Sequence, residues 1–170
     1  MKNFTKIFAI ATVVLGFATT SFAQVTKTAT ATGTIITPIA MTNTGDMNFG
    51  NVAVSAAAGT VVLAPAGSRT ATLGVTLPAV PGTVTAAHFD VTGTPNYTYA
   101  ITLPTTATTV TSGSNTMTVT AFTSNPGTTG TLSAAGKQTI DVGATLNVGA
   151  NQASGTYVSA IPFDVTVNYN

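Results

Sequence analysis

The chain has 170 residues, of which 44% are hydrophobic and only 5% are charged, with a formal net charge of +1, one histidine and no cysteine. So few charges exclude a nucleic-acid-binding surface, because nothing neutralises a row of phosphates, and the absence of cysteine excludes the usual zinc sites. Disorder is also excluded, since disordered chains combine low hydrophobicity with high charge. We therefore expect a folded protein that holds no metal and no other cofactor.

Residues 1–23 have the three parts of a secretory signal peptide. Lys2 and Lys6 give a positive start, residues 7–18 are apolar, and small residues precede Gln24. The apolar run is shorter than the roughly 20 residues that cross a bilayer, so a membrane anchor is the weaker alternative. We expect a mature chain that starts at Gln24, has no membrane span, and resides outside the cytoplasm, in the periplasm or on the cell surface.

The rest of the chain alternates small or apolar residues with polar ones over short runs, bounded by Gly, Pro, Asn and Ser. This pattern predicts β-strands, and helical periodicity is absent. Strands are expected at residues 26–35, 47–54, 60–63, 69–75, 87–91, 97–103, 116–122, 138–142, 145–148 and 163–170. Because the spacing is irregular, we predict an all-β protein with a single immunoglobulin-like or pilin-like β-sandwich of about eight or nine strands over residues 24–170.

Few residues suit catalysis or metal binding. His88 and Asp90 would share one face of a strand, but no Gly-x-Ser-x-Gly motif accompanies them, so a solvated polar face is the stronger interpretation. The four aspartates lie too far apart in sequence to suggest a glycosidase pair. Asn43, Asp46 and Asn48 could bind calcium, although their spacing favours a turn in which they bond their own backbone. We expect a protein that is not an enzyme.

Three stretches carry a resemblance to known proteins: residues 29–40 (ATATGTIITPIA), residues 46–50 (DMNFG), and Gly155-Thr156-Tyr157 followed by FDVTVNYN at the C-terminus. With them the chain resembles the bacterial family called domain of unknown function 4402. It is also similar to spore coat protein U-like and chaperone–usher fimbrial subunits. That resemblance implies an incomplete sandwich, completed by the N-terminal strand of the next subunit.

The resemblance also implies which residues take part in assembly. Gly155 and Tyr169 match the glycine near the start of the last strand and the penultimate tyrosine of the fimbrial subunits. Two features depart from that pattern: the cysteine pair of many such subunits is absent, and about two extra residues near 160–162 suggest a bulge.

Residues 24–35 alternate as a donor strand requires, although Lys27 interrupts the face and alanine fills a groove poorly. They either donate in trans or form the chain's own first strand. The threonine row on their other face also suits an ordinary edge strand, whereas an ice-binding face would need several such rows. The predicted assembly residues are Val25, Ala29, Ala31, Gly33, Ile35, Gly155, Phe163, Val165, Val167 and Tyr169.

The sequence thus predicts a non-catalytic, secreted structural subunit of a bacterial surface fibre or coat. Its expected partners are copies of itself or related subunits, with a periplasmic chaperone as a further candidate. The alternative is a monomeric extracellular binding module or adhesin that recognises a glycan or a protein.

Overall fold

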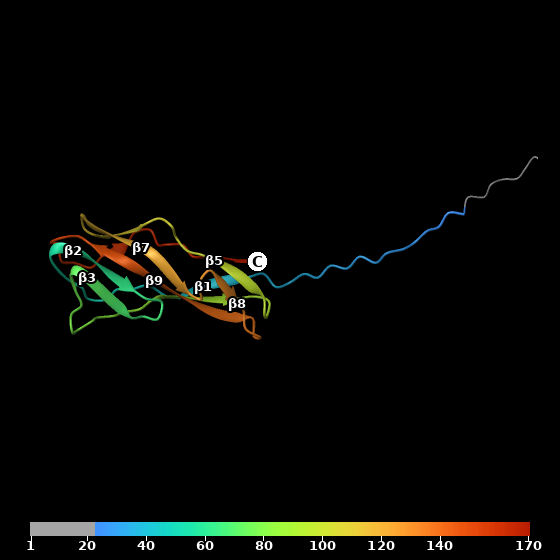
Figure 1. The fold of residues 1–170 in the computed structure, drawn as a ribbon, viewed down its shortest axis with the longest axis horizontal. Coiled ribbons are helices and arrows are strands. Elements are labelled where there is room, and N and C mark those ends of the chain that lie inside the picture. Colours follow the sequence, from blue (N-terminus) through green and yellow to red (C-terminus); the bar gives the residue numbers. More distant parts are fainter. Residues whose placement is uncertain (1–22) are drawn as a thin grey trace, which may run out of the picture. The chain divides into compact units, whose positions relative to one another are not determined.

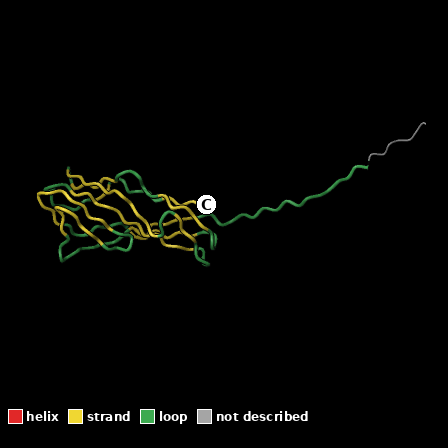
Figure 2. Tube along the Cα trace, in the orientation of Figure 1, coloured by secondary structure: helices red, strands yellow, loops and turns green. Residues whose placement is uncertain are grey.

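The computed structural model describes residues 23–170, which contain no helix and eleven β-strands in two antiparallel sheets (Figures 1 and 2). Residues 35–170 form one compact unit. Residues 23–34 belong to a separate unit and carry no strand. Apart from Ala23, the predicted signal peptide lies outside the described residues.

The strands follow one another along the compact unit and differ widely in length. They are β1 (Ala40–Gly45), β2 (Ala53–Leu63), β3 (Arg69–Thr76), β4 (Ala87–Thr92), β5 (Thr98–Thr102), β6 (Thr108–Ser112), β7 (Asn115–Asn125), β8 (Thr129–Thr131), β9 (Lys137–Val148), β10 (Val158–Ser159) and β11 (Thr166–Tyr169).

The large sheet is organised around β9, its longest strand. The first half of β9 pairs with β4 and the second half with β2, while β7 pairs along its other side. β1 lies outside β4, β3 lies outside β2, and β6 and β10 continue beyond β7. The small sheet has three strands in the order β11-β5-β8. An all-β, sandwich-like fold is therefore confirmed.

Alternating apolar residues place the strands in these layers. In β9, Ile140, Val142, Ala144, Leu146 and Val148 are all buried, because residues two apart point to the same face of a sheet. Two strands were expected here, and that expectation is wrong: Gly143 lies on the other face, so the inward series continues through it without a break. Merging two expected strands, and the absence of those expected at residues 26–35 and 47–54, lowers the count from ten to seven, and the unexpected β1, β6, β8 and β10 raise it to eleven.

The expected strand at residues 47–54 is also wrong. β1 ends at Gly45, and the following segment makes only an isolated bridge between Asn48 and Thr85 before β2 starts. The side chains of Asn43 and Asn48 accept bonds from the N–H groups of Gly45 and Gly50, each at 2.8 Å. These are the local turns that the sequence favoured over a calcium loop.

Two apolar clusters make up the core. The first lies between the small sheet and the β1-β4-β9 part of the large sheet, and the second lies under β2, β3, β6, β7 and the end of β9. Met47 and Phe122 contact both clusters. Arg69 fixes the segment that follows Met47, because its guanidinium donates to the main-chain carbonyls of Phe49 and Asn51.

Candidate assembly edge

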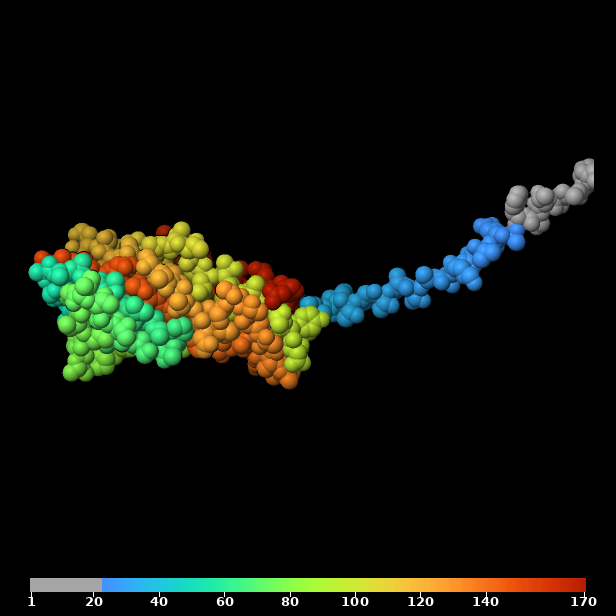
Figure 3. Space-filling model, in the orientation of Figure 1, coloured from blue at the N-terminus to red at the C-terminus, as the bar shows by residue number. Residues whose placement is uncertain are grey.

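The predicted residues of the last strand share one face. Val165 is buried in the first core cluster, and Phe163, Val167 and Tyr169 pack against that cluster, while the residues between them are exposed. Within the described residues, β11 pairs only with β5, so it is an edge strand of the small sheet. The C-terminal residues lie at the surface in the space-filling view (Figure 3). The outer backbone edge of β11 is therefore free for pairing.

The start of β1 lies next to the end of β11. The hydroxyl of Tyr169 donates to the carbonyl of Thr37 (2.9 Å) and accepts a bond from the N–H of Thr94 (2.7 Å). Ile39 and Met41 pack against the same cluster as β11. Since β1 pairs only with β4 among the described strands, both sheets end in an edge strand over one shared core cluster. The sequence marked Tyr169 by resemblance but gave no sign of its bonds.

The predicted N-terminal residues lie before or at the start of the compact unit. Val25, Ala29, Ala31 and Gly33 are exposed and belong to no strand, so the structure does not assign residues 24–35 to the large or the small sheet. Ile35 is fully exposed, at 100% of its surface, and Val25 is exposed at 77%. Both are large apolar side chains without burial.

Gly155 is not on the last strand. It lies beside Ser112 at the end of β6, in the connection before β10, and a side chain at this position would force the serine hydroxyl to move. The small size of this glycine therefore serves packing on the large sheet. The chain then leaves the large sheet after β10 and joins the small sheet at β11.

The polar residues considered for catalysis have other partners. His88 Nδ1 lies 2.6 Å from Asp141 Oδ1 on β9, directly across the ladder, and Asp90 accepts a bond from the hydroxyl of Thr139 (2.8 Å). No serine hydroxyl bonds His88 within residues 23–170. The same residues contain no group of three or more His, Cys, Asp or Glu side chains that could hold a metal ion. These pairs stand on a part-exposed face of the sheet and form no enclosed site.

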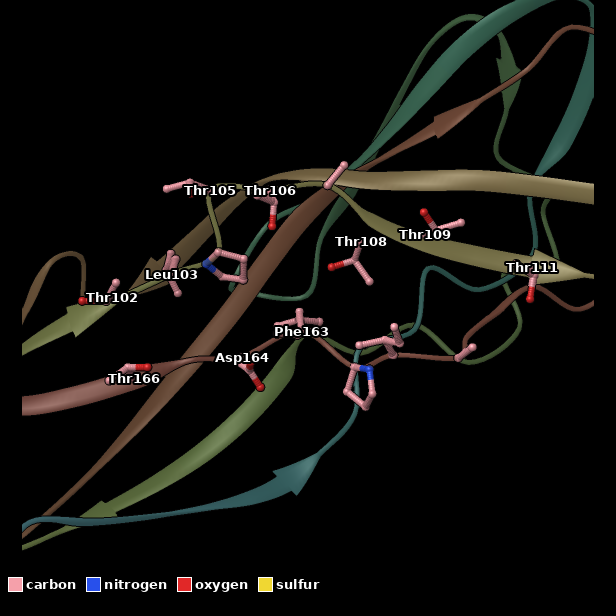
Figure 4. A pocket seen from close by; sticks show the side chains of 15 residues that line it. Thr102, Leu103, Thr105, Thr106, Thr108, Thr109, Thr111, Phe163, Asp164 and Thr166 are labelled. Atoms are coloured by element: carbon pink, nitrogen blue, oxygen red, sulfur yellow. The ribbon is translucent and has the colours of Figure 1, made fainter.

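A cavity of about 660 Å³ lies between the β5–β6 connection and the β10–β11 connection (Figure 4). Its walls include threonines of the first segment and Ile161, Pro162, Phe163 and Asp164 of the second. The sequence suggested a bulge near residues 160–162. In the structure the β5–β6 and β10–β11 connections instead do not pair with each other here, because each passes from one sheet to the other.

The described residues thus define an all-β protein of two stacked antiparallel sheets, with no helix of the length and hydrophobicity of a membrane span. A comparison with family models matches residues 39–169 to the family described as Domain of unknown function (DUF4402), and the chain belongs to this family. A search of curated proteins and a search of solved structures each give no match. The likeness to spore coat protein U-like and fimbrial subunits stays a prediction.

Proposed function

We propose that the protein is a secreted structural subunit of a bacterial surface fibre or coat, in which residues 24–35 of one copy add as a strand to β11 of another. The observation that carries this proposal is the unpaired outer edge of β11 above an apolar cluster. Natural edge strands are usually protected by short length, lysine, proline or a bulge. β11 (Thr166–Tyr169) is short but carries no lysine, proline or bulge, so its edge stays a template for a short added strand.

The N-terminal segment has the properties of the added strand. Its alternation places Ala29, Ala31, Gly33 and Ile35 on one side, together with Lys27, its one charged side chain. In strand addition, main-chain hydrogen bonds supply affinity while alternate side chains fit the surface below. Few charges need to be desolvated, which lowers the cost of burying the segment. Covering Ile35 in the same step would remove a fully exposed apolar side chain from water.

The bond between Tyr169 and Thr37 bears on the kind of assembly. It places the point where each copy's N-terminal segment joins the compact unit at the C-terminal end of its β11. A strand that adds antiparallel to β11 would bring its domain to the opposite end, so copies would follow head to tail in an open fibre. A parallel strand would bring both domains to one end and allow a closed, reciprocal dimer. Antiparallel pairing is the more stable kind per residue, which favours the fibre.

Electron microscopy and light scattering test the proposal on the chain from Gln24 and on a truncation that starts at Ile36. The truncation keeps almost the whole compact unit, including both core clusters. We expect fibres or large oligomers from the longer chain and monomers from the truncation. Ala31→Asp, on the donor face, should abolish assembly, whereas Thr30→Asp, on the opposite face, should preserve it.

Two results would contradict the proposal. A longer chain that stays monomeric, beside a truncation that has lost much of its stability, would assign residues 24–35 to the protein's own sandwich. Equal effects of Ala31→Asp and Thr30→Asp would show that charge alone, and not a strand with two distinct faces, controls association. Discrete dimers in place of fibres would keep strand addition but reverse the expected orientation.

A further inference from the structure

The two chain segments beside the cavity would form one continuous ribbon if their pairing were not interrupted. Thr102 pairs with Thr166 between β5 and β11, and Val110 pairs with Ser159 between β6 and β10. Residues 103–109 and residues 160–165 lie between these pairs and make no ladder with each other. Two antiparallel walls therefore separate and meet again, and the space between them is the cavity.

Each of the two segments contains a proline. Pro104 lies in one segment and Pro162 in the other, and neither has an N–H group to donate to a ladder. For the same reason an inserted peptide strand would find an incomplete set of donors on both sides. The cavity is thus poorly suited to a further β-strand, in contrast to the outer edge of β11.

The lining combines flat apolar groups with hydroxyls. Phe163, Leu103 and the two prolines supply apolar surface, and Phe163 is supported from behind by Phe122, with ring centroids 4.9 Å apart. Seven of the lining residues are threonines, whose hydroxyls can donate and accept, and the hydroxyl of Thr111 already donates to the carbonyl of Val158. The seven threonines are Thr102, Thr105, Thr106, Thr108, Thr109, Thr111 and Thr166. In Figure 4, Thr108 and Phe163 project toward each other from the two walls.

The charge of the lining narrows the class of ligand. Asp164 is the one ionised residue among the lining residues, and it is exposed at the cavity's rim. Without a lysine, arginine or histidine in the lining, a phosphate or carboxylate would meet no positive charge and would be repelled. A single carboxylate also falls short of the six to eight oxygen ligands of calcium.

We propose that this cavity binds an uncharged sugar ring. A pyranose presents an apolar C–H face, which fits Phe163 and the prolines, and a rim of hydroxyls, which fits the threonines. The carboxylate of Asp164 accepts two sugar hydroxyls in charge-assisted bonds, the strongest type available here. The volume falls in the range of about 300–1,000 Å³ found for small-molecule sites. A subunit of this kind would bind neutral glycans along the assembly that it builds.

Titration of the isotope-labelled Ala31→Asp chain, which we expect to be monomeric, with neutral methyl hexosides, followed by NMR, tests the proposal. We expect at least one of the methyl glycosides of glucose, galactose, mannose and N-acetylglucosamine to cause saturable shifts confined to residues 102–111 and 158–166. Asp164→Asn should weaken that binding about tenfold, equivalent to about 1.4 kcal/mol. Thr131→Val, on the surface of β8, should leave it unchanged. Methyl glucuronide, which adds a carboxylate to the glucose framework, should bind more weakly than methyl glucoside.

The proposal is overturned if none of the four neutral sugars gives saturable shifts, if the shifts centre elsewhere, or if Asp164→Asn and Thr131→Val behave alike. The sugar site and strand addition fail separately. Asp164→Asn leaves the donor segment and β11 intact, so assembly should persist in that variant. Ala31→Asp leaves the cavity intact, so sugar binding should persist when assembly is lost.

Discussion

The hydroxyl of Tyr169 bonds the last strand, β11, to the segment that precedes β1. Removing this hydroxyl measures how much the bonds contribute to stability. Tyr169→Phe keeps the ring, including its edge-to-face contact with Tyr97 at 5.7 Å, and deletes only the oxygen. Two hydrogen bonds are lost, one to the carbonyl of Thr37 and one from the N–H of Thr94. No other group changes, so the effect on stability reports these two bonds.

The expected cost follows from the exposure of each bond. The Thr94 bond is partly buried, and its loss leaves an N–H short of a partner, which costs about 1.5 kcal/mol. The Thr37 bond is exposed, water can replace it, and it contributes about 0.5 kcal/mol. The free energy of unfolding should therefore fall by about 2 kcal/mol, and Tm by about 6 °C in a domain of this size.

Urea unfolding followed by circular dichroism gives the free energy of unfolding. An unchanged dependence of that free energy on urea concentration would show that the variant exposes the same surface area on unfolding. Tyr97→Phe is the matched control: it sits on the partner ring, and its hydroxyl makes no hydrogen bond among the described residues, so we expect a change below about 0.5 kcal/mol. If the two variants unfold alike, the bonds do not hold β1 to β11. The inference that the N-terminal segment joins the compact unit beside the end of β11 would then fail too.

Three further predictions concern the folded domain. Val61→Ala should cost about 2 kcal/mol because Val61 is fully buried, whereas Val62→Ala, at a side chain exposed at 40%, should cost far less; equal losses in urea unfolding would contradict the assigned faces of β2. Burial raises the pKa of the Tyr99 hydroxyl above its ordinary value. The unfolded chain therefore loses this proton at lower pH than the folded chain, so stability should fall as pH rises from the ordinary value toward the raised one, and Tyr99→Phe should remove that part of the fall. Arg69→Met deletes both bonds to the carbonyls of residues 49 and 51 and should cost about 2–4 kcal/mol, measured in the same way; a loss near zero would show that water replaces the guanidinium.

Much of the fold was predictable because strand formation leaves a local trace. Alternation with a period of two identified β3, β4, β5 and β7 close to their observed bounds, and it assigned Phe163, Val165 and the following apolar residues of the C-terminus to one face. It failed where alternation was weak or misleading. β1 was missed because its pattern, AMTNTG, reads as a turn, and β9 was divided because a glycine normally weakens a strand.

What the sequence determined by itself was the class of the protein, since a low charge, many β-branched residues and short alternating runs leave few architectures other than stacked sheets. Only the tertiary structure decided which strands have a free edge, because pairing depends on how faces far apart in the chain pack together. It joined Tyr169 to Thr37 across 132 positions and His88 to Asp141 across 53. It also placed the cavity beside Phe163, where the β5–β6 and β10–β11 connections both pass between the two sheets. No local pattern encodes these contacts, because each depends on the register of strands that the core holds in place.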